Sequence, residues 1–262
     1  MSEHRSGRYV IGALLAVTVG AGGVAAYTVL TPEGPVAVRA ETATARPQGA
    51  AVPLADPRPP APPWVAVPVA SGASGADVRK VQEVLHELGY QVREVNGGFD
   101  DETRHAVIAF QKVQGLERTG VVDEATAAAL RNPVRPEPRA RAGVRVEVDL
   151  ARQVTYFLDG AGRIERIYDS STGRNSTDKA TPTGEFAVTR QINGWRYARL
   201  GPMWRPSYIG QGGTDQGIAF HGGEPVEVWP ASNGCIRMTD PSVDETFGIL
   251  RPGTRVLVHD GK

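Results

Sequence analysis

The chain has 262 residues, which is long enough for one or two compact domains. Its 29 Lys and Arg residues balance its 29 Asp and Glu residues, so neither a strongly basic surface nor a nucleic-acid partner is expected. The single cysteine, Cys235, excludes an internal disulfide framework and a cysteine-rich metal site. No metal-ligand spacing and no nucleotide-binding loop occur, so the sequence predicts neither a metal nor another cofactor.

The first predicted element is an uncharged run of 21 residues from Val10 to Leu30. Its length fits the roughly 20 residues of a membrane-spanning helix. Arg5 and Arg8 precede it, and positive charge marks the cytoplasmic end of such a helix. We therefore expect residues 1–9 in the cytoplasm, a single-pass signal anchor over 10–30, and the remaining chain outside the cell membrane. A signal peptide that is cleaved after export is the alternative.

Residues 31–70 form a predicted linker. Half of the 20 prolines of the chain lie between Pro32 and Pro68, and no hydrophobic periodicity accompanies them. Such a segment can act as a semi-rigid spacer, because polyproline II backbone extends by about 3.1 Å per residue. Ordinary disorder without a selected length is the alternative.

Residues 71–132 are predicted to form a small helical module. Apolar residues recur at helical spacing from Val78 to Leu88, with Asp77 as the expected N-cap and Gly89 as the expected end of this helix. A short repeat follows, in which each copy has a glycine for a turn, an apolar residue for the core and an aspartate to cap the next helix. The two copies are Gly97-Gly98-Phe99-Asp100 with Thr103, and Gly120-Val121-Val122-Asp123 with Thr126.

This module resembles the peptidoglycan-binding domain 1 family, which has three helices. The resemblance covers nearly the whole segment and rests mainly on residues that form the fold, so it implies the fold more firmly than the ligand. A helical spacer that has lost its ligand is the alternative. The matching residues are Val78, Leu85, Leu88-Gly89-Tyr90, Gly97, Phe99-Asp100, Thr103, Ala106-Val107, Phe110-Gln111, Gly115-Leu116, Gly120, Thr126 and Leu130.

A second proline-containing linker is predicted over residues 133–142, and the pattern changes to period two from Gly143. The unit 143–262 is therefore predicted to be mostly β, and the whole chain to be an α+β multidomain protein. A short helix is predicted from Asp244 to Leu250. The predicted strands begin at Val144 and continue with Val154 to Leu158, Ile164 to Tyr168, Phe186 to Thr189, Ile218 to Phe220 and Arg255 to His259.

Two residues of this unit could carry chemistry. His221 directly follows the predicted strand that ends at Phe220, and Cys235 lies 14 positions further along the chain. A lone cysteine is either a small buried apolar residue or a reactive thiol. Gly234 allows backbone conformations next to Cys235 that other residues disfavour, and the positive charge of Arg237 would favour the thiolate. Spacing alone leaves both readings of Cys235 open, because the thiol and the imidazole must also meet in space.

The β-rich unit resembles the L,D-transpeptidase catalytic domain, also called the YkuD domain. The matching stretches follow the family's order over about 115 residues, and the cysteine motif with the upstream His-Gly is highly specific. The stretches are Val148-Asp149-Leu150 with Gln153, Ser171-Thr172-Gly173, Thr181-Pro182-Thr183-Gly184-Glu185-Phe186, Ile218-Ala219-Phe220-His221-Gly222, Ser232-Asn233-Gly234-Cys235-Ile236-Arg237-Met238 and Pro252-Gly253-Thr254.

The resemblance implies a nucleophilic Cys235, with His221 as its general base and acid. The carbonyl of Gly222 would steady the imidazole. The backbone around Gly234 and Cys235 would form an oxyanion hole, and Ser232 would stabilise the motif.

Arg237 and Tyr208 are the expected substrate contacts. The family usually has histidine where this chain has Asn233, and we expect activity to survive because His221 already supplies a base. Trp195, Trp204, Tyr208 and Trp229 lie on loops around the expected cleft, where they either line a substrate groove or pack in the core, and we expect core packing for most of them.

By resemblance, the predicted function is peptidoglycan L,D-transpeptidation, which forms 3→3 cross-links between stem peptides through a cysteine thioester. The expected partners are peptidoglycan stem peptides and glycan, and the expected state is a monomer attached to the membrane by its N-terminal helix. The alternatives are an L,D-carboxypeptidase, a transferase that attaches proteins to peptidoglycan, and a peptidoglycan-binding protein whose catalytic site has decayed.

Overall fold

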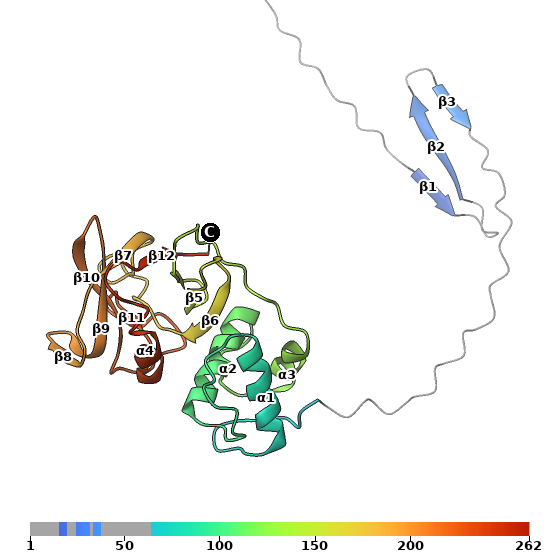
Figure 1. The fold of residues 1–262 in the computed structure, drawn as a ribbon. Coiled ribbons are helices and arrows are strands. Elements are labelled where there is room, and N and C mark those ends of the chain that lie inside the picture. Colours follow the sequence, from blue (N-terminus) through green and yellow to red (C-terminus); the bar gives the residue numbers. More distant parts are fainter. Residues whose placement is uncertain (1–15, 20–24, 32–33, 38–63, 262) are drawn as a thin grey trace, which may run out of the picture. The chain divides into compact units, whose positions relative to one another are not determined.

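The structure is a computed structural model that describes residues 16–19, 25–31, 34–37 and 64–261 (Figure 1). The chain divides into two units, residues 1–60 and 61–262. The described part of the first unit is an antiparallel sheet of the strands β1 (Ala16–Val19), β2 (Ala25–Thr31) and β3 (Gly34–Ala37).

The helix predicted from Val10 to Leu30 lies within this first unit, and only part of it falls on described residues. Residues 10–15 and 20–24 lie outside the described residues, whereas 16–19 and 25–30 belong to strands. Among the described residues, no helix has both the length and the apolar character needed to cross a membrane.

The second unit begins earlier than predicted. Residues 64–70 were assigned to the linker, yet Val65 and Val69 are buried, and Val69 pairs with Val122 in an antiparallel bridge. The rest of the predicted linker that follows β3, residues 38–63, lies outside the described residues.

Three helices form the predicted module: α1 (Ala76–Glu87), α2 (Asp101–Gln114) and α3 (Glu124–Arg131). Both repeat aspartates cap helices as predicted, because Asp100 accepts from the Thr103 N–H and Asp123 from the Thr126 N–H, each at 2.8 Å. The prediction that Asp77 caps α1 is wrong. Gly75 is the N-cap, and the carboxylate of Asp77 instead accepts from the Ala66 N–H at 3.2 Å.

A nine-stranded sheet forms the predicted β-rich unit, in the order β11-β10-β9-β7-β12-β4-β5-β6 with β8 paired to β9. The pairs β10–β11 and β12–β4 are parallel, and the other pairs are antiparallel. The strands are β4 (Val146–Asp149), β5 (Val154–Leu158), β6 (Ile164–Asp169), β7 (Gly184–Gln191), β8 (Trp195–Ala198), β9 (Gly201–Gln211), β10 (Thr214–Gly222), β11 (Ile236–Arg237) and β12 (Arg255–His259).

Two elements of this unit differ from the sequence-based expectation. The short helix α4 spans Asp240–Thr246 rather than Asp244 to Leu250, because Thr239 caps it and Pro241 occupies its first turn. The hairpin of β8 and β9 was not predicted.

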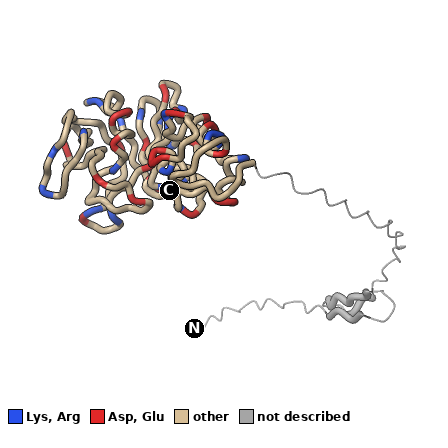
Figure 2. Tube along the Cα trace, turned by 90° about the horizontal axis from the view of Figure 1, so that it is seen from below, with Lys and Arg blue, Asp and Glu red and all other residues tan. Residues whose placement is uncertain are grey.

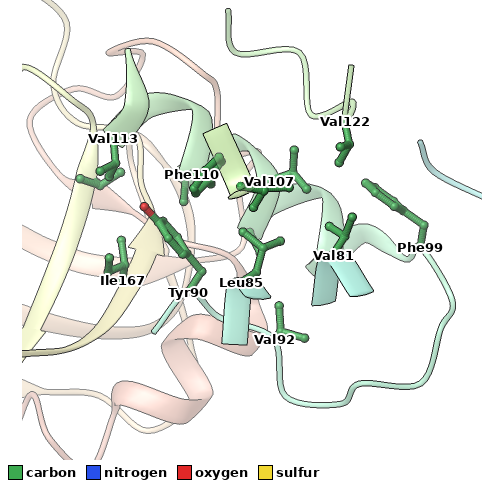
Figure 3. Close-up of a cluster of buried hydrophobic side chains, with 14 of the residues drawn as sticks. Val81, Leu85, Tyr90, Val92, Phe99, Val107, Phe110, Val113, Val122 and Ile167 are labelled. Carbon is green, nitrogen blue, oxygen red and sulfur yellow. The ribbon is translucent and has the colours of Figure 1, made fainter. Parts of the chain in front are cut away.

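The two faces of β5 and β6 enter two different cores. Val154, Tyr156 and Leu158 pack with the helices of the module, whereas Phe157 points into the core on the other face of the sheet. Side chains alternate along a strand, so one short segment closes both cores. Ile167 of β6 joins the module core in the same way and lies beside Tyr90 (Figure 3).

Hydrogen bonds also join the module to the sheet. Tyr90 and Ile167 form a parallel bridge, in which the Ile167 N–H donates to the Gly89 carbonyl at 2.8 Å. The Gln91 amide donates to Glu245 of α4 at 3.1 Å. Residues 133–142 contain no helix or strand, but the backbone N–H groups of Arg139 and Ala140 both donate to Glu147 at 2.8 Å. The module and the sheet therefore form one packed body.

The shared core predicts a single unfolding transition for residues 64–261. Replacing Ile167 by alanine should lower the free energy of unfolding by about 2–5 kcal/mol, because a large buried side chain is removed. Urea unfolding is followed by tryptophan fluorescence and by far-UV circular dichroism. The two signals should give coincident curves for the wild-type protein, and again for Ile167→Ala. Separate transitions for the helices and the sheet would contradict the shared core.

Candidate active site

His221 lies near the end of β10, at one rim of a cleft of about 320 Å³. Its Nδ1 lies 2.7 Å from the Gly222 carbonyl oxygen. A carbonyl only accepts, so Nδ1 carries the proton and Nε2 is left as the basic nitrogen. Burial lowers the pKa of His221 from its usual value, so the ring is neutral at pH 7.

Gly222 is fixed in place by α4. A Cβ at this position would lie 2.2 Å from Oδ1 of Asp240, the same oxygen that accepts from the Gly223 N–H at 2.6 Å. Any larger residue would have to displace the Asp240 carboxylate, and the added Cβ would also lie 3.2 Å from the Cα of Asp240. The carbonyl that holds the imidazole is therefore positioned by the packing of the strand end against the first residue of α4.

Cys235 belongs to the loop Ser232–Cys235, which lines the same cleft as His221. Gly234, directly before the cysteine, has a φ of 114°, which favours glycine. The Ser232 hydroxyl donates to the Cys235 carbonyl at 2.6 Å and accepts from the Gly234 N–H at 3.1 Å. Ser232 thus shapes the loop from within.

The thiol of Cys235 is held in its neutral form at rest. Burial raises its pKa, and this outweighs the lowering by the Ala219 N–H and by Arg237. Arg237 lowers this pKa in the expected direction, whereas Glu224, which pairs with the Arg237 guanidinium and also lines the cleft, raises it. The thiol donates to the Gly217 carbonyl at 3.9 Å, so it must leave this contact and pass its proton to the neutral imidazole in the same cleft before it can attack.

The segment from Ser171 to Arg174 supports the cysteine loop along its length. Ser171 exchanges two backbone hydrogen bonds with Arg237, and the Thr172 carbonyl accepts from the Ser232 N–H at 2.9 Å. The Arg174 N–H donates to the Ser232 carbonyl at 3.1 Å. On the other side, the Thr181 hydroxyl donates to the Gly234 carbonyl at 2.8 Å.

The remaining predicted site residues lie around the same cleft. Asn233 accepts a hydrogen bond from the Arg174 guanidinium at 2.5 Å, so its side chain joins the loop to the supporting segment. Tyr208 lines the cleft; Arg190 stacks on its ring at 3.5 Å from the centroid. The Tyr208 hydroxyl is buried and has no partner among the described residues.

Of the two backbone groups expected to form an oxyanion hole, the Gly234 N–H is already engaged by Ser232. The structure gives the Cys235 N–H no hydrogen-bond acceptor among the described residues. The donor to a developing oxyanion is therefore expected to be the Cys235 N–H, next to the attacking sulfur.

The sequence did not reveal the hairpin of β8 and β9, which carries much of the cleft wall. Arg196, Arg199 and Leu200 belong to it and line the cleft. The expectation that most of the tryptophans pack in the core is wrong for two of them. Trp195 of the hairpin and Trp229 before the cysteine loop are 46% and 57% exposed. The signal available in the sequence was the cluster of aromatic and arginine residues from Trp195 to Arg199.

Two family models match separate parts of the chain. The L,D-transpeptidase catalytic domain matches residues 143–258, and the "Putative peptidoglycan binding domain" matches residues 74–130. These ranges cover the β-rich unit and the three helices.

Among the described residues, no cluster of side chains suited to hold a metal ion is found.

Individual proteins show the same similarity. A crystal structure of the L,D-transpeptidase (residues 123–326) from Xylanimonas cellulosilytica is 36% identical, with a TM-score of 0.67, and the match covers 77% of this chain and all of that one. The "Putative L,D-transpeptidase YqjB" of Bacillus subtilis is 36% identical over 124 residues, which is 41% of this chain and 66% of that protein.

The contact between Gly222 and Asp240 leads to a prediction. Gly222→Ala should lower the free energy of unfolding by about 1–3 kcal/mol, because the added methyl group meets a packed carboxylate. It should also change the ¹⁵N shifts of the His221 ring, since the carbonyl that accepts from Nδ1 must move. Gly160→Ala is the control, because a Cβ there meets nothing within 4 Å. Equal stability of the two variants would show that the close packing at Gly222 is unimportant.

Proposed function

Because the chain belongs to the L,D-transpeptidase family, we propose that it is a peptidoglycan L,D-transpeptidase that forms 3→3 cross-links through a thioester on Cys235. One observation carries this proposal. The thiol of Cys235 and the ring of His221 line one cleft, and Nδ1 of His221 is held by the Gly222 carbonyl. In this proposal the thiol turns from the Gly217 carbonyl, which lies 3.9 Å from Sγ, towards the basic Nε2.

In the first half-reaction, Nε2 of His221 takes the thiol proton as Cys235 attacks the carbonyl carbon at the third residue of a donor tetrapeptide. The negative charge that develops on the carbonyl oxygen would be stabilised by the Cys235 N–H. The tetrahedral intermediate collapses as the bond to the terminal D-alanine breaks. The imidazolium returns its proton to the leaving amine, and a thioester remains on Cys235.

In the second half-reaction, an amine from another stem peptide attacks the thioester. His221 takes a proton from this amine and returns it to the departing sulfur, which restores the thiol. Water in place of the amine would give a carboxypeptidase, and a protein amine would give a protein-attaching transferase. The acceptor therefore decides between these activities, whereas the acyl-enzyme is common to all of them.

Charge in the cleft supports a donor that carries carboxylates. Arg196 and Arg199 line the cleft, and among the described residues no carboxylate lies within ion-pair distance of either. Arg237 is balanced by Glu224. A stem peptide brings free carboxylates to such a wall, where guanidinium groups bind them in a fixed geometry. We assign Arg237 to holding the cleft rim, and Tyr208 to contacting the stem through its unpaired hydroxyl.

Peptidoglycan lies outside the cytoplasmic membrane, so this proposal requires export. The uncharged run from Val10 to Leu30 with its preceding arginines supports export, either as an anchor or as a cleaved signal. The helical module supports the same substrate, since its family model describes peptidoglycan binding.

The acyl-enzyme is tested by intact-mass spectrometry with a carbapenem or with a tetrapeptide donor. The wild-type protein should gain one adduct, and Cys235→Ala should gain none. His221→Ala should acylate at least about 100-fold more slowly, because general-base assistance is commonly worth 10²- to 10⁴-fold. Trp229→Phe, which changes an exposed residue before the loop, is a suitable control.

Full adduct formation on Cys235→Ala would overturn the assignment of the nucleophile. Chromatography of the products from purified muropeptides then identifies the acceptor. Cross-linked dimers support the transpeptidase, whereas shortened monomers alone would replace it by a carboxypeptidase. Binding to peptidoglycan without any acyl-enzyme would favour a decayed catalytic site.

The pH dependence of acylation gives a further prediction. Burial lowers the pKa of His221, so its base form persists below pH 6.5 and the acid limb of the rate should lie below that value. Between pH 6.5 and 8 the rate should be nearly constant. In His221→Ala it should instead rise with pH as the thiol ionises, since burial raises the pKa of Cys235. A wild-type rate that climbs tenfold per pH unit over this range would contradict base catalysis.

A further inference from the structure

Lys112 lies in the last turn of α2 and is fully buried, with a side chain 0% exposed. All three of its ammonium hydrogens find acceptors in the sheet unit. It donates to the Asp169 carboxylate at 2.5 Å, to the Ser170 carbonyl at 2.9 Å and to the Gln153 carbonyl at 3.0 Å. A buried charge that is fully hydrogen-bonded and paired fixes its neighbours in one arrangement.

The second oxygen of Asp169 is also held by α2. Nδ1 of His105 lies 2.6 Å from it, and His105 precedes Lys112 by two helical turns, on the same face. The Arg104 guanidinium lies 2.9 Å from Nε2 of His105, which leaves Nδ1 as the nitrogen that donates to the carboxylate. The end of β6 is therefore fastened to the module at both oxygens of one side chain.

From this point a short run of hydrogen bonds leads to the cysteine loop. Gln153 has a φ of 63°, an uncommon backbone for a residue with a side chain. Its amide donates to the Thr172 hydroxyl at 2.7 Å and accepts from the Thr172 N–H at 2.8 Å. The Thr172 carbonyl in turn accepts from the N–H groups of Ala231 and Ser232 at 2.9 Å. Lys112 thus holds both the Gln153 carbonyl and the start of the segment that supports the loop of Cys235.

A second contact reaches the loop from the module directly. The Arg118 guanidinium, between α2 and α3, donates to the Val228 carbonyl at 2.6 Å. The carbonyl of the next residue, Trp229, accepts from the Ser171 hydroxyl at 2.7 Å. The chain that enters the cysteine loop is therefore held from the module and from the supporting segment at adjacent residues.

We propose that Lys112, paired with Asp169, is a positioning residue for the reaction at Cys235. Through this residue the helical module would contribute to the rate of that reaction. This inference rests on the proposed role of Cys235. The module would then act on the chemistry by fixing the backbone that carries the sulfur and the Cys235 N–H. A displacement of about 1 Å in such groups can cost on the order of 10²-fold in rate.

The experiment uses the full chain with Lys112→Met and with the double variant Lys112→Met/Asp169→Asn. The single variant leaves a buried carboxylate with one partner fewer, whereas the double variant also removes that charge and is designed to fold. Lys80→Met is the matched control, because Lys80 lies on the surface of α1 with a side chain 48% exposed. Acylation by a carbapenem is followed as a function of its concentration, well below each variant's melting temperature.

The saturating acylation rate of the double variant should fall about 10- to 100-fold, with less than a threefold change in the half-saturating concentration. Lys80→Met should match the wild type in both constants. A double variant that melts at lower temperature but acylates within twofold of the wild type would overturn the inference, since Lys112 would then only stabilise the fold.

The variant Arg118→Ala is an independent test, because it leaves the buried pair of Lys112 and Asp169 intact. It should lower the saturating rate in the same direction by about 3- to 10-fold, since it releases the Val228 carbonyl at the entrance to the loop. An unchanged rate in both this variant and the double variant would restrict the module to a separate role. Failure of the wild-type protein to acylate would instead overturn the proposed function, and this inference with it.

Discussion

The arrangement at the cleft depends on the backbone between Asp169 and Arg174, which is hydrogen-bonded on both of its sides. Its beginning is fastened to α2 through Lys112 and His105, and its remainder pairs with the loop and strand around Cys235. Buried peptide groups must find partners, so this segment cannot shift on one side without breaking bonds on the other. The position of the sulfur is in this way set by contacts that lie outside the cleft.

Local features of the fold could be predicted from the sequence. The caps at Asp100 and Asp123 form within four residues, and the strand predicted from Val154 to Leu158 is β5. Asp77 was misassigned because its side chain is taken by Ala66, 11 positions away. The hairpin of β8 and β9 was missed because its arginines and glycine interrupt any period-two pattern, and its aromatic side chains are partly exposed.

The candidate site also contains residues that the sequence predicted and residues that it did not. Cys235, His221 and Gly222 were found because a short, specific motif carries them, although their roles remain predictions. Lys112 gave no signal, since its partner lies 57 positions away and a lysine in a helix normally suggests a solvated surface. Positions of Lys and Arg are interspersed with positions of Asp and Glu along the chain of the second unit, so charge patterning did not single out Lys112 either (Figure 2).

The core shared by α2 and the strands β5 and β6 has a geometric consequence for substrate handling. The face of the module that meets the sheet is no longer open to a polysaccharide. A glycan strand held by the module would therefore lie on another of its surfaces, at a constant offset from the cleft. The enzyme would then select stem peptides that project from the bound glycan at one fixed distance and in one fixed direction.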